Sequence, residues 1–326
     1  MKVLSLKPFI KPGITTFILM LVSYVGIWTV NILMLPEFTD AGSALRDNNW
    51  SVVYHLTVLF LLITINSVLL RRFVLHFSII RTKSFLPVFF FLTFTAVWSG
   101  MRTDLFPHFY LTVFLISLEL FFGMYRNRKA VEPAFLGSLL IAVTSLHHPF
   151  YLLLLPILWT GWIILKSVSL RSWLASLTGI AIPWIFYNAW YWFQGIEITF
   201  SPEFSQLASP GINFSQYTDS FLMYSGTLVV TALFCVLGLF SKLLDDSIQT
   251  RKNIYILVLI LIFILVFNIL YPGTTTLFLP LTAFLTAVIM AHPFTLRKSL
   301  LYPLLFILFA AVNIVYLLSQ HLQLFN

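Results

Sequence analysis

Apolar stretches, each long enough or nearly long enough to cross a lipid bilayer, follow one another along this chain. A helix rises about 1.5 Å per residue, so about 20 apolar residues span the roughly 30 Å of a hydrocarbon core. We identify eleven such runs, at residues 14–35, 52–70, 85–99, 109–124, 132–147, 149–165, 173–194, 219–240, 254–271, 275–291 and 299–318. Only helices and closed barrels satisfy their backbone groups in lipid, and continuous runs lack the alternating pattern of a barrel. The sequence therefore predicts an all-α, polytopic transmembrane bundle that forms a single helical membrane domain over residues 1–326.

The scarcity of charged residues supports this interpretation. Only 9% of the 326 residues are charged and 60% are hydrophobic, whereas a soluble domain has about 25% charged and about 45–50% apolar residues. This composition argues against a soluble enzyme, a nucleic-acid-binding protein or a disordered chain. The single cysteine, Cys235, lies within an apolar run, so the chain cannot form an internal disulfide and offers that residue no partner for a metal site.

The positions of the basic residues predict how the runs are oriented. Cytoplasmic loops of membrane proteins carry an excess of Lys and Arg. With the N-terminus inside and eleven spans, 17 of the 19 Lys and Arg lie in inner segments, and only Arg46 and Arg102 lie outside. We therefore expect an inner N-terminus, an uncleaved first helix and an outer C-terminus at Asn326. Orientation and anionic lipid headgroups account for the net charge of +8, so no nucleic-acid partner is required.

Two hairpin apices on the predicted outer side, at residues 100–108 and 147–149, are flanked by short runs. At about 1.5 Å per residue these runs reach only roughly 21–26 Å, so the apices are expected to lie below the outer membrane surface. Polar groups at that depth need water or protein partners. We therefore expect the two apices to be neighbours that line an outward-open polar cavity. The longest outer loops, 36–51 and 195–218, are too short for a folded domain and are expected to form small caps.

The outer loops also contain the charged residues best suited to chemistry. Arg102 is predicted to bind an anionic group such as phosphate through its bidentate fork, with Asp104 beside it. The alternative is an Arg102–Asp104 ion pair that only closes the loop. Asp40 and Asp47, in the first outer loop, are candidate catalytic bases. Alternatively, one of these two carboxylates is an ordinary helix N-cap.

Histidines in the two apices are further candidates for substrate binding. His147 and His148 are candidates for shuttling protons near neutral pH or for binding a metal. His108 is a candidate for contacting the substrate phosphate together with Arg102. Adjacent histidines on a helix point about 100° apart, so His147 and His148 are poorly placed to share one metal ion. No HExxH motif accompanies them. The alternative is a polar hairpin apex that precedes Pro149.

Aromatic residues gather at the predicted outer end of the run 173–194. Trp and Tyr are enriched at the membrane–water interface of any membrane protein, which is the simplest explanation. A platform on which sugar rings stack is the alternative. The residues are Trp184, Tyr187, Trp190, Tyr191 and Trp192.

A set of short patterns lies between Phe85 and Gln194. They are Leu86-Pro87 opening a Phe-rich run, Phe106-Pro107-His108, Tyr125-Arg126-Asn127-Arg128, Gly137-Ser138-Leu139 leading to His147-His148-Pro149, and Arg171-Ser172-Trp173 before Gly179 and Pro183. Through them, roughly a third of the chain resembles an uncharacterised family of Bacteroidetes integral membrane proteins, a domain of unknown function. The family brings no established activity.

The architecture as a whole carries a second resemblance. About a dozen spans, an inward N-terminus and an acidic first outer loop directly after the first helix are similar to the large membrane class of lipid-linked-sugar glycosyltransferases. In that class an acid of the first loop acts as a base or a metal ligand, so the resemblance leaves a divalent metal open as a cofactor. This chain differs in having a first loop of only 16 residues without an Asp-x-Asp or Asp-Glu pair.

These observations lead to one expectation and two alternatives. We expect a protein of envelope glycan assembly that transfers a sugar from a polyprenyl-phosphate donor at the outer face of a bacterial inner membrane. Asp40 or Asp47 would deprotonate the acceptor, and Arg102, with His108 or His148, would neutralise the departing lipid phosphate. The alternatives are a non-enzymatic scaffold or assembly factor of an envelope complex, and a transporter or flippase.

Overall fold

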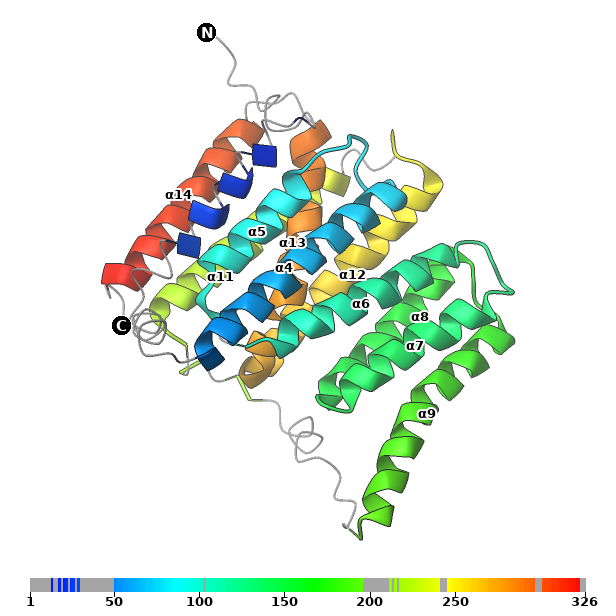
Figure 1. Cartoon of the computed structure of the whole chain (residues 1–326). Coiled ribbons are helices and arrows are strands. Elements are labelled where there is room, and N and C mark those ends of the chain that lie inside the picture. Colours follow the sequence, from blue (N-terminus) through cyan, green and yellow to red (C-terminus); the bar gives the residue numbers. More distant parts are fainter. Residues whose placement is uncertain are drawn as a thin grey trace. The chain divides into compact units, whose positions relative to one another are not determined.

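The computed structural model shows an all-α protein (Figure 1). It describes Gly13, residues 17–29 except 19, 23 and 27, and residues 50–101, 104–195, 211–240 except 213 and 216, 245–296 and 301–322. No strand occurs in these residues, which confirms the predicted fold class. The α-helices are α4 (Trp50–His76), α5 (Leu86–Val97), α6 (Phe106–Gly123), α7 (Val131–Ser145), α8 (Leu154–Leu165), α9 (Leu170–Phe193), α11 (Asp219–Phe240), α12 (Ile248–Leu270), α13 (Thr275–Leu296) and α14 (Leu301–Leu322). Short 3-10 helices are η1 (Ser99–Met101), η2 (Pro149–Leu153) and η4 (Pro272–Thr274).

The lengths and compositions of these helices make the chain a multi-pass membrane protein. Among the described residues, six helical segments are long and apolar enough to cross a membrane. They are Tyr54–His76, Phe106–Gly123, Asp219–Phe240, Ile248–Leu270, Pro272–Thr295 and Pro303–Gln320. Leu86–Val97, Val131–Ser145 and Pro149–Leu165 are apolar but shorter, as the short runs of the sequence predict.

The helix α6 begins earlier than its apolar run. The run 109–124 predicts a start after His108, whereas α6 begins at Phe106. Asp104 explains the difference, because its Oδ1 accepts a hydrogen bond from the Phe106 N–H at 3.1 Å and Pro107 suits a first helical turn. His108 therefore lies within the first turn of α6 rather than in the loop.

The chain divides into two compact units. Unit 1 contains Met1–His108, Asn213–Asp246 and Thr276–Asn326, and unit 2 contains Phe109–Ile212 and Ser247–Thr275. Each unit is assembled from segments that are distant in the sequence.

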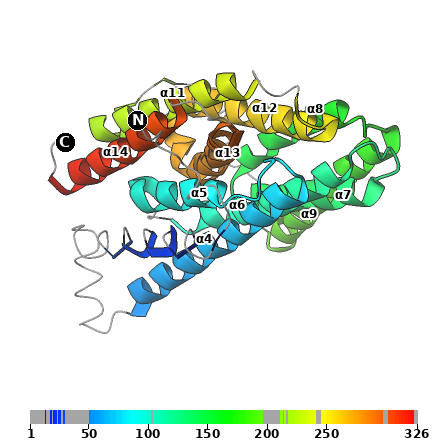
Figure 2. The same cartoon turned by 90° about the horizontal axis from the view of Figure 1, so that it is seen from above.

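Unit 1 is built around α13, in which every residue from Leu277 to Phe294 is buried. Aromatic side chains fill the space between its helices: the ring of Phe309 lies 5.1 Å from that of Phe90 and 5.6 Å from that of Phe94. Figure 2 shows α11 beside α14. Between these two helices Tyr224 stacks on Tyr316 at 4.1 Å and donates a hydrogen bond from its hydroxyl to Asn313 Oδ1 at 2.8 Å.

Unit 2 is dominated by the close packing of α7 on α9, which run side by side (Figure 1). A Cβ atom added at Gly179 would lie only 2.5 Å from the carbonyl oxygen of Phe135, so a glycine is required for this approach. Along the same interface Ser138 Oγ lies 2.6 Å from Ser176 Oγ. Small residues thus bring the two backbones together, and hydroxyl pairs join them.

Candidate functional site

Polar and aromatic side chains gather at one end of unit 2, at the apex between α7 and η2. Tyr110 Oη of α6 lies 2.6 Å from His147 Nδ1, and the two groups share a hydrogen bond. The rings of His147 and His148 are 4.6 Å apart, and the ring of Tyr151 lies 4.9 Å from that of Tyr110. Tyr110 and Tyr151 are each 2% exposed, whereas His147 is exposed. We call these four residues the apex cluster.

Local backbone structure places the two histidines at the apex. The helix α7 ends at Ser145, and the backbone N–H groups of His147 and His148 both donate to the carbonyl of Thr144, at 3.3 and 3.2 Å. His148 then adopts an extended conformation, with φ −134° and ψ 100°, because the residue before a proline is excluded from the helical region. Pro149 opens η2, which reverses the chain and directs both imidazoles to the end of the bundle.

The apex cluster is held against α9 by a tryptophan. Trp184 Nε1 donates a hydrogen bond to Ser145 Oγ at 3.1 Å, and its ring lies 6.0 Å from that of Tyr187. Tyr187 and Tyr191 follow one turn apart, with ring centroids 4.6 Å from each other. Beyond them Trp190 and Trp192 are 65% and 71% exposed. The end of α9 therefore offers aromatic faces near the apex, a surface suited to the membrane interface or to sugar rings.

Two of the predicted site residues lie in unit 1. Asp104 is exposed and caps α6, as described above. His108 is fully buried, with Nε2 2.8 Å from the carbonyl oxygen of Met101. Its own carbonyl accepts a hydrogen bond from Asn66 Nδ2 at 2.9 Å. These contacts make His108 a residue that fixes the apex 100–108 to α4.

The remaining predicted residues fall elsewhere. Asp40, Asp47 and Arg102 lie outside the described residues. Their roles, and the expected proximity of the apices 100–108 and 147–149, stay predictions. Within unit 2 the structure brings His147 and His148 together with Tyr110, a contact that sequence reasoning missed. The sequence offers one signal for it: Tyr110 follows the first apex by two residues, near the start of the run 109–124.

A buried ionic cluster in unit 1 was also missed. Arg81 Nε donates a short hydrogen bond to Asp246 Oδ1, and His292 Nε2 lies 3.5 Å from Asp246 Oδ2. The side chains of Asp246 and His292 are 2% and 1% exposed, and that of Arg81 is 36% exposed. Donation of this hydrogen bond to the Asp246 carboxylate raises the pKa of Arg81 above its usual value. His292 directly follows the apolar run 275–291. A histidine at that position is the sequence signal that predicts a buried polar cluster.

The described residues show no metal centre. No group of three or more His, Cys, Asp or Glu among them has a metal-binding arrangement. Comparisons with models of protein families, with curated proteins and with solved structures found no match. The two resemblances drawn from the sequence accordingly stay predictions.

Proposed function

We propose that this chain is a membrane enzyme of envelope glycan assembly, which transfers a sugar from a polyprenyl-phosphate donor at the outer face of the bacterial inner membrane. The proposal rests on the apex cluster. It unites an exposed imidazole, a buried tyrosine that orients it and a neighbouring aromatic surface at an end of a membrane-spanning bundle. A lipid-linked sugar needs these three features together: an apolar bundle beside its tail, groups for its phosphate and faces for its sugar.

The single observation that carries the proposal is the 2.6 Å hydrogen bond between Tyr110 and His147. A general acid or base must be held in one orientation to transfer a proton efficiently, and a hydrogen bond from a second residue is the usual means. Tyr110 is buried and cannot itself reach solvent. Its role is to fix the imidazole of His147, which then hydrogen-bonds the leaving phosphate or the acceptor.

The charged residues of the outer loops complete the proposed mechanism. Asp40 or Asp47 deprotonates the acceptor hydroxyl, which then attacks the anomeric carbon of the donor. Arg102 neutralises the phosphate as the bond to the sugar breaks. A planar guanidinium contacts two phosphate oxygens at once, so Arg102→Lys should retain little activity and Arg102→Ala less. Asp40→Asn and Asp47→Asn should differ, because only one of the two is the base.

A matched pair of histidine variants tests the proposal. Separate cultures would express the wild-type chain, the His147→Gln variant or the His76→Gln variant at equal levels. The surface glycans of these cultures would then be compared. Both histidines are exposed, but His76 ends α4 among basic residues, far in the sequence from the apices. The proposal expects loss of glycan in His147→Gln alone. Normal glycans in the His147, Arg102 and both Asp variants would refute the enzyme and favour a scaffold.

A transporter or flippase is the second candidate, and the buried cluster of Arg81, Asp246 and His292 favours it. Charged groups buried in membrane proteins commonly mark ion or proton pathways. The helix α13 also contains two internal prolines, Pro280 and Pro293, although it runs without a break from Thr275 to Leu296. If transport is the function, Asp246→Asn should abolish it while His147→Gln does not. The opposite pattern supports the enzyme.

A further inference from the structure

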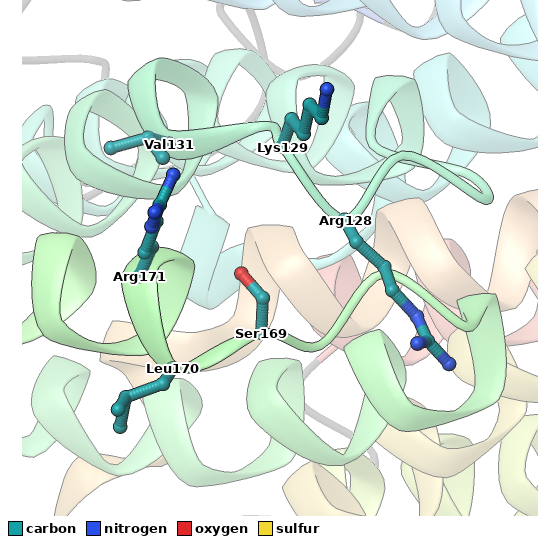
Figure 3. A pocket seen from close by; sticks show the side chains of 6 residues that line it. All are labelled: Arg128, Lys129, Val131, Ser169, Leu170 and Arg171. Atoms are coloured by element: carbon teal, nitrogen blue, oxygen red, sulfur yellow. The ribbon is translucent and has the colours of Figure 1, made fainter.

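A pocket with a volume of about 450 Å³ opens in unit 2 where two of its short connections meet (Figure 3). One is the loop between α6 and α7, and the other is the turn between α8 and α9. Six residues line it: Arg128, Lys129, Val131, Ser169, Leu170 and Arg171. A volume in the range of about 300–1,000 Å³ is typical of small-ligand sites.

The lining is basic. Three of its six residues are cations and none is an acid. In Figure 3 the Arg171 side chain extends from α9 toward Val131, while Arg128 and Lys129 extend to either side of their loop. All Lys and Arg of unit 2 belong to this end of its helices: Arg126, Arg128, Lys129, Lys166, Arg171, Arg251 and Lys252. Glu132, exposed in the first turn of α7, is the acid nearest to the lining in the sequence. The pocket therefore favours an anion.

Backbone contacts hold the two connections in place. Arg126 and Lys166 both adopt left-handed conformations, with φ of 58° and 59°. Lys166 is the C-cap of α8, and Arg126 lies three residues after the end of α6. The Arg126 N–H donates to the carbonyl of Leu165 at 3.1 Å and so ties one connection to the other. Asn127 Oδ1 accepts from the Lys129 N–H at 3.0 Å. The basic side chains thus project from a preformed frame.

Two helices begin at the pocket. The first residues of α7 and α9, Val131 and Leu170, are both part of its lining. Helix N-termini carry partial positive charge and attract anions. Ser169 already caps α9 by accepting from the Ser172 N–H at 3.1 Å. The N-cap of α7 is Ala130, which makes no side-chain cap hydrogen bond, and the Val131 N–H donates to the Lys129 carbonyl at 2.9 Å.

An apolar rim adjoins the charges. Leu170 is 72% exposed, and the neighbouring Leu174, Val168 and Trp173 are 50%, 42% and 40% exposed. A tryptophan next to basic residues is typical of the membrane interface. A free anion would gain nothing from this rim, whereas the acyl chains of a lipid would cover it.

We propose that this pocket binds the phosphate headgroup of an anionic phospholipid, taken from the membrane leaflet that the basic end of unit 2 faces. Arg128, Lys129 and Arg171 supply the positive charge that attracts the phosphate, and the acyl chains lie along the rim at Leu170 and Trp173. Basic pockets between membrane helices bind anionic headgroups in this manner. The site lies at the opposite end of α7 from the apex cluster and does not depend on the proposed sugar transfer.

Lipid titration of the purified full-length chain in detergent, followed by native mass spectrometry, tests the assignment. The probe is phosphatidylglycerol, with phosphatidylcholine as the neutral comparison. One cation near a membrane surface contributes about a fivefold change in affinity. We expect Arg171→Gln and Arg128→Gln each to weaken phosphatidylglycerol binding about fivefold, and the double variant about 25-fold. Arg171→Lys should retain most of the affinity, and Lys83→Gln, an exposed cation outside the pocket, should change nothing.

Inorganic phosphate distinguishes a lipid from a soluble anion. If the acyl chains contribute as proposed, phosphate at the same concentration as the lipid leaves phosphatidylglycerol bound. Displacement by equimolar phosphate would overturn the lipid assignment. Equal binding of phosphatidylglycerol and phosphatidylcholine by the wild-type chain would overturn it as well. Unchanged phosphatidylglycerol binding by the double variant would also overturn the assignment, provided that this variant elutes as a single species like the wild type.

Discussion

The Tyr110 hydroxyl oxygen and His147 Nδ1 lie 2.6 Å apart, although 37 residues separate them in the sequence. The contact joins α6 to the apex that follows α7. It sets a buried phenol beneath an exposed imidazole, so the orientation of His147 depends on a residue that solvent does not reach.

Tyr110→Phe therefore provides a conservative test of the apex cluster. The substitution removes the hydroxyl and keeps the ring, so the packing against Tyr151 should persist while His147 loses its fixed orientation. Misplacement of a catalytic group can cost about 100-fold. We expect glycan formation to fall by about 10- to 100-fold without loss of the purified protein's thermal stability. Tyr54→Phe, at an exposed position of α4, serves as the control. Equal rates for both variants would remove Tyr110 from the proposed mechanism.

Gly179→Ala should destabilise the packing of α7 on α9. The new Cβ would lie 2.5 Å from the Phe135 carbonyl oxygen, which belongs to the backbone and cannot rotate away. Overpacking of this kind costs about 1–3 kcal/mol. In α11, a Cβ at Gly226 meets nothing within 4 Å, so Gly226→Ala should be neutral or stabilising by up to about 1 kcal/mol. Thermal unfolding of the two variants in the same detergent measures the difference, and a Gly179→Ala variant as stable as Gly226→Ala would disprove the close approach.

Asp246→Asn should destabilise unit 1 by more than Asp245→Asn. Asp246 is buried, accepts from Arg81 and lies beside His292, whereas its neighbour Asp245 is exposed. Hydrogen bonds to charged groups contribute about 1.5–3 kcal/mol, and the partial exposure of Arg81 places this one at the lower end. The midpoint of thermal unfolding reports the loss. Identical midpoints for the two variants would show that the cluster does not hold the fold together.

Cysteine labelling tests the predicted orientation. In a Cys235→Ser background, single cysteines would replace Asn127, between α6 and α7, and Gln194, after α9; both positions are exposed. The distribution of Lys and Arg predicts that Asn127→Cys reacts only with a membrane-permeant reagent and that Gln194→Cys also reacts with an impermeant one. Labelling in the reverse pattern would invert the topology and place the apex cluster in the cytoplasm.

Hydropathy alone was sufficient for most of the helices. It underestimated one short run, 109–124, because α6 (Phe106–Gly123) has 18 residues and is long enough to cross a membrane. Each predicted run from 52–70 onward contains a helix, because the backbone of an apolar segment must satisfy its own hydrogen bonds in lipid. Helix ends were predicted less well. The helix α12 starts at Ile248, six residues before its apolar run, since Ser247 caps it by accepting from the Thr250 N–H at 3.1 Å.

The side-chain partnerships could not be predicted in the same way. Hydropathy identifies His147 as polar but says nothing of Tyr110, because their contact depends on how α6 and α7 pack. The same applies to Trp184 with Ser145, and to Asp246 with His292. Arg102, Asp40 and Asp47 remain predictions from the sequence, founded on charge and position rather than on contacts.

The quantity of polyprenyl-phosphate-linked sugar in living cells tests the central claim most directly. It would be measured in cells that lack the chain and in the same cells complemented with the wild type, His147→Gln or His76→Gln. We predict that the lipid-linked sugar accumulates without the chain and with His147→Gln, and returns to normal with the wild type and His76→Gln. Unchanged lipid-linked sugar in cells that lack the chain would contradict the proposed transfer reaction.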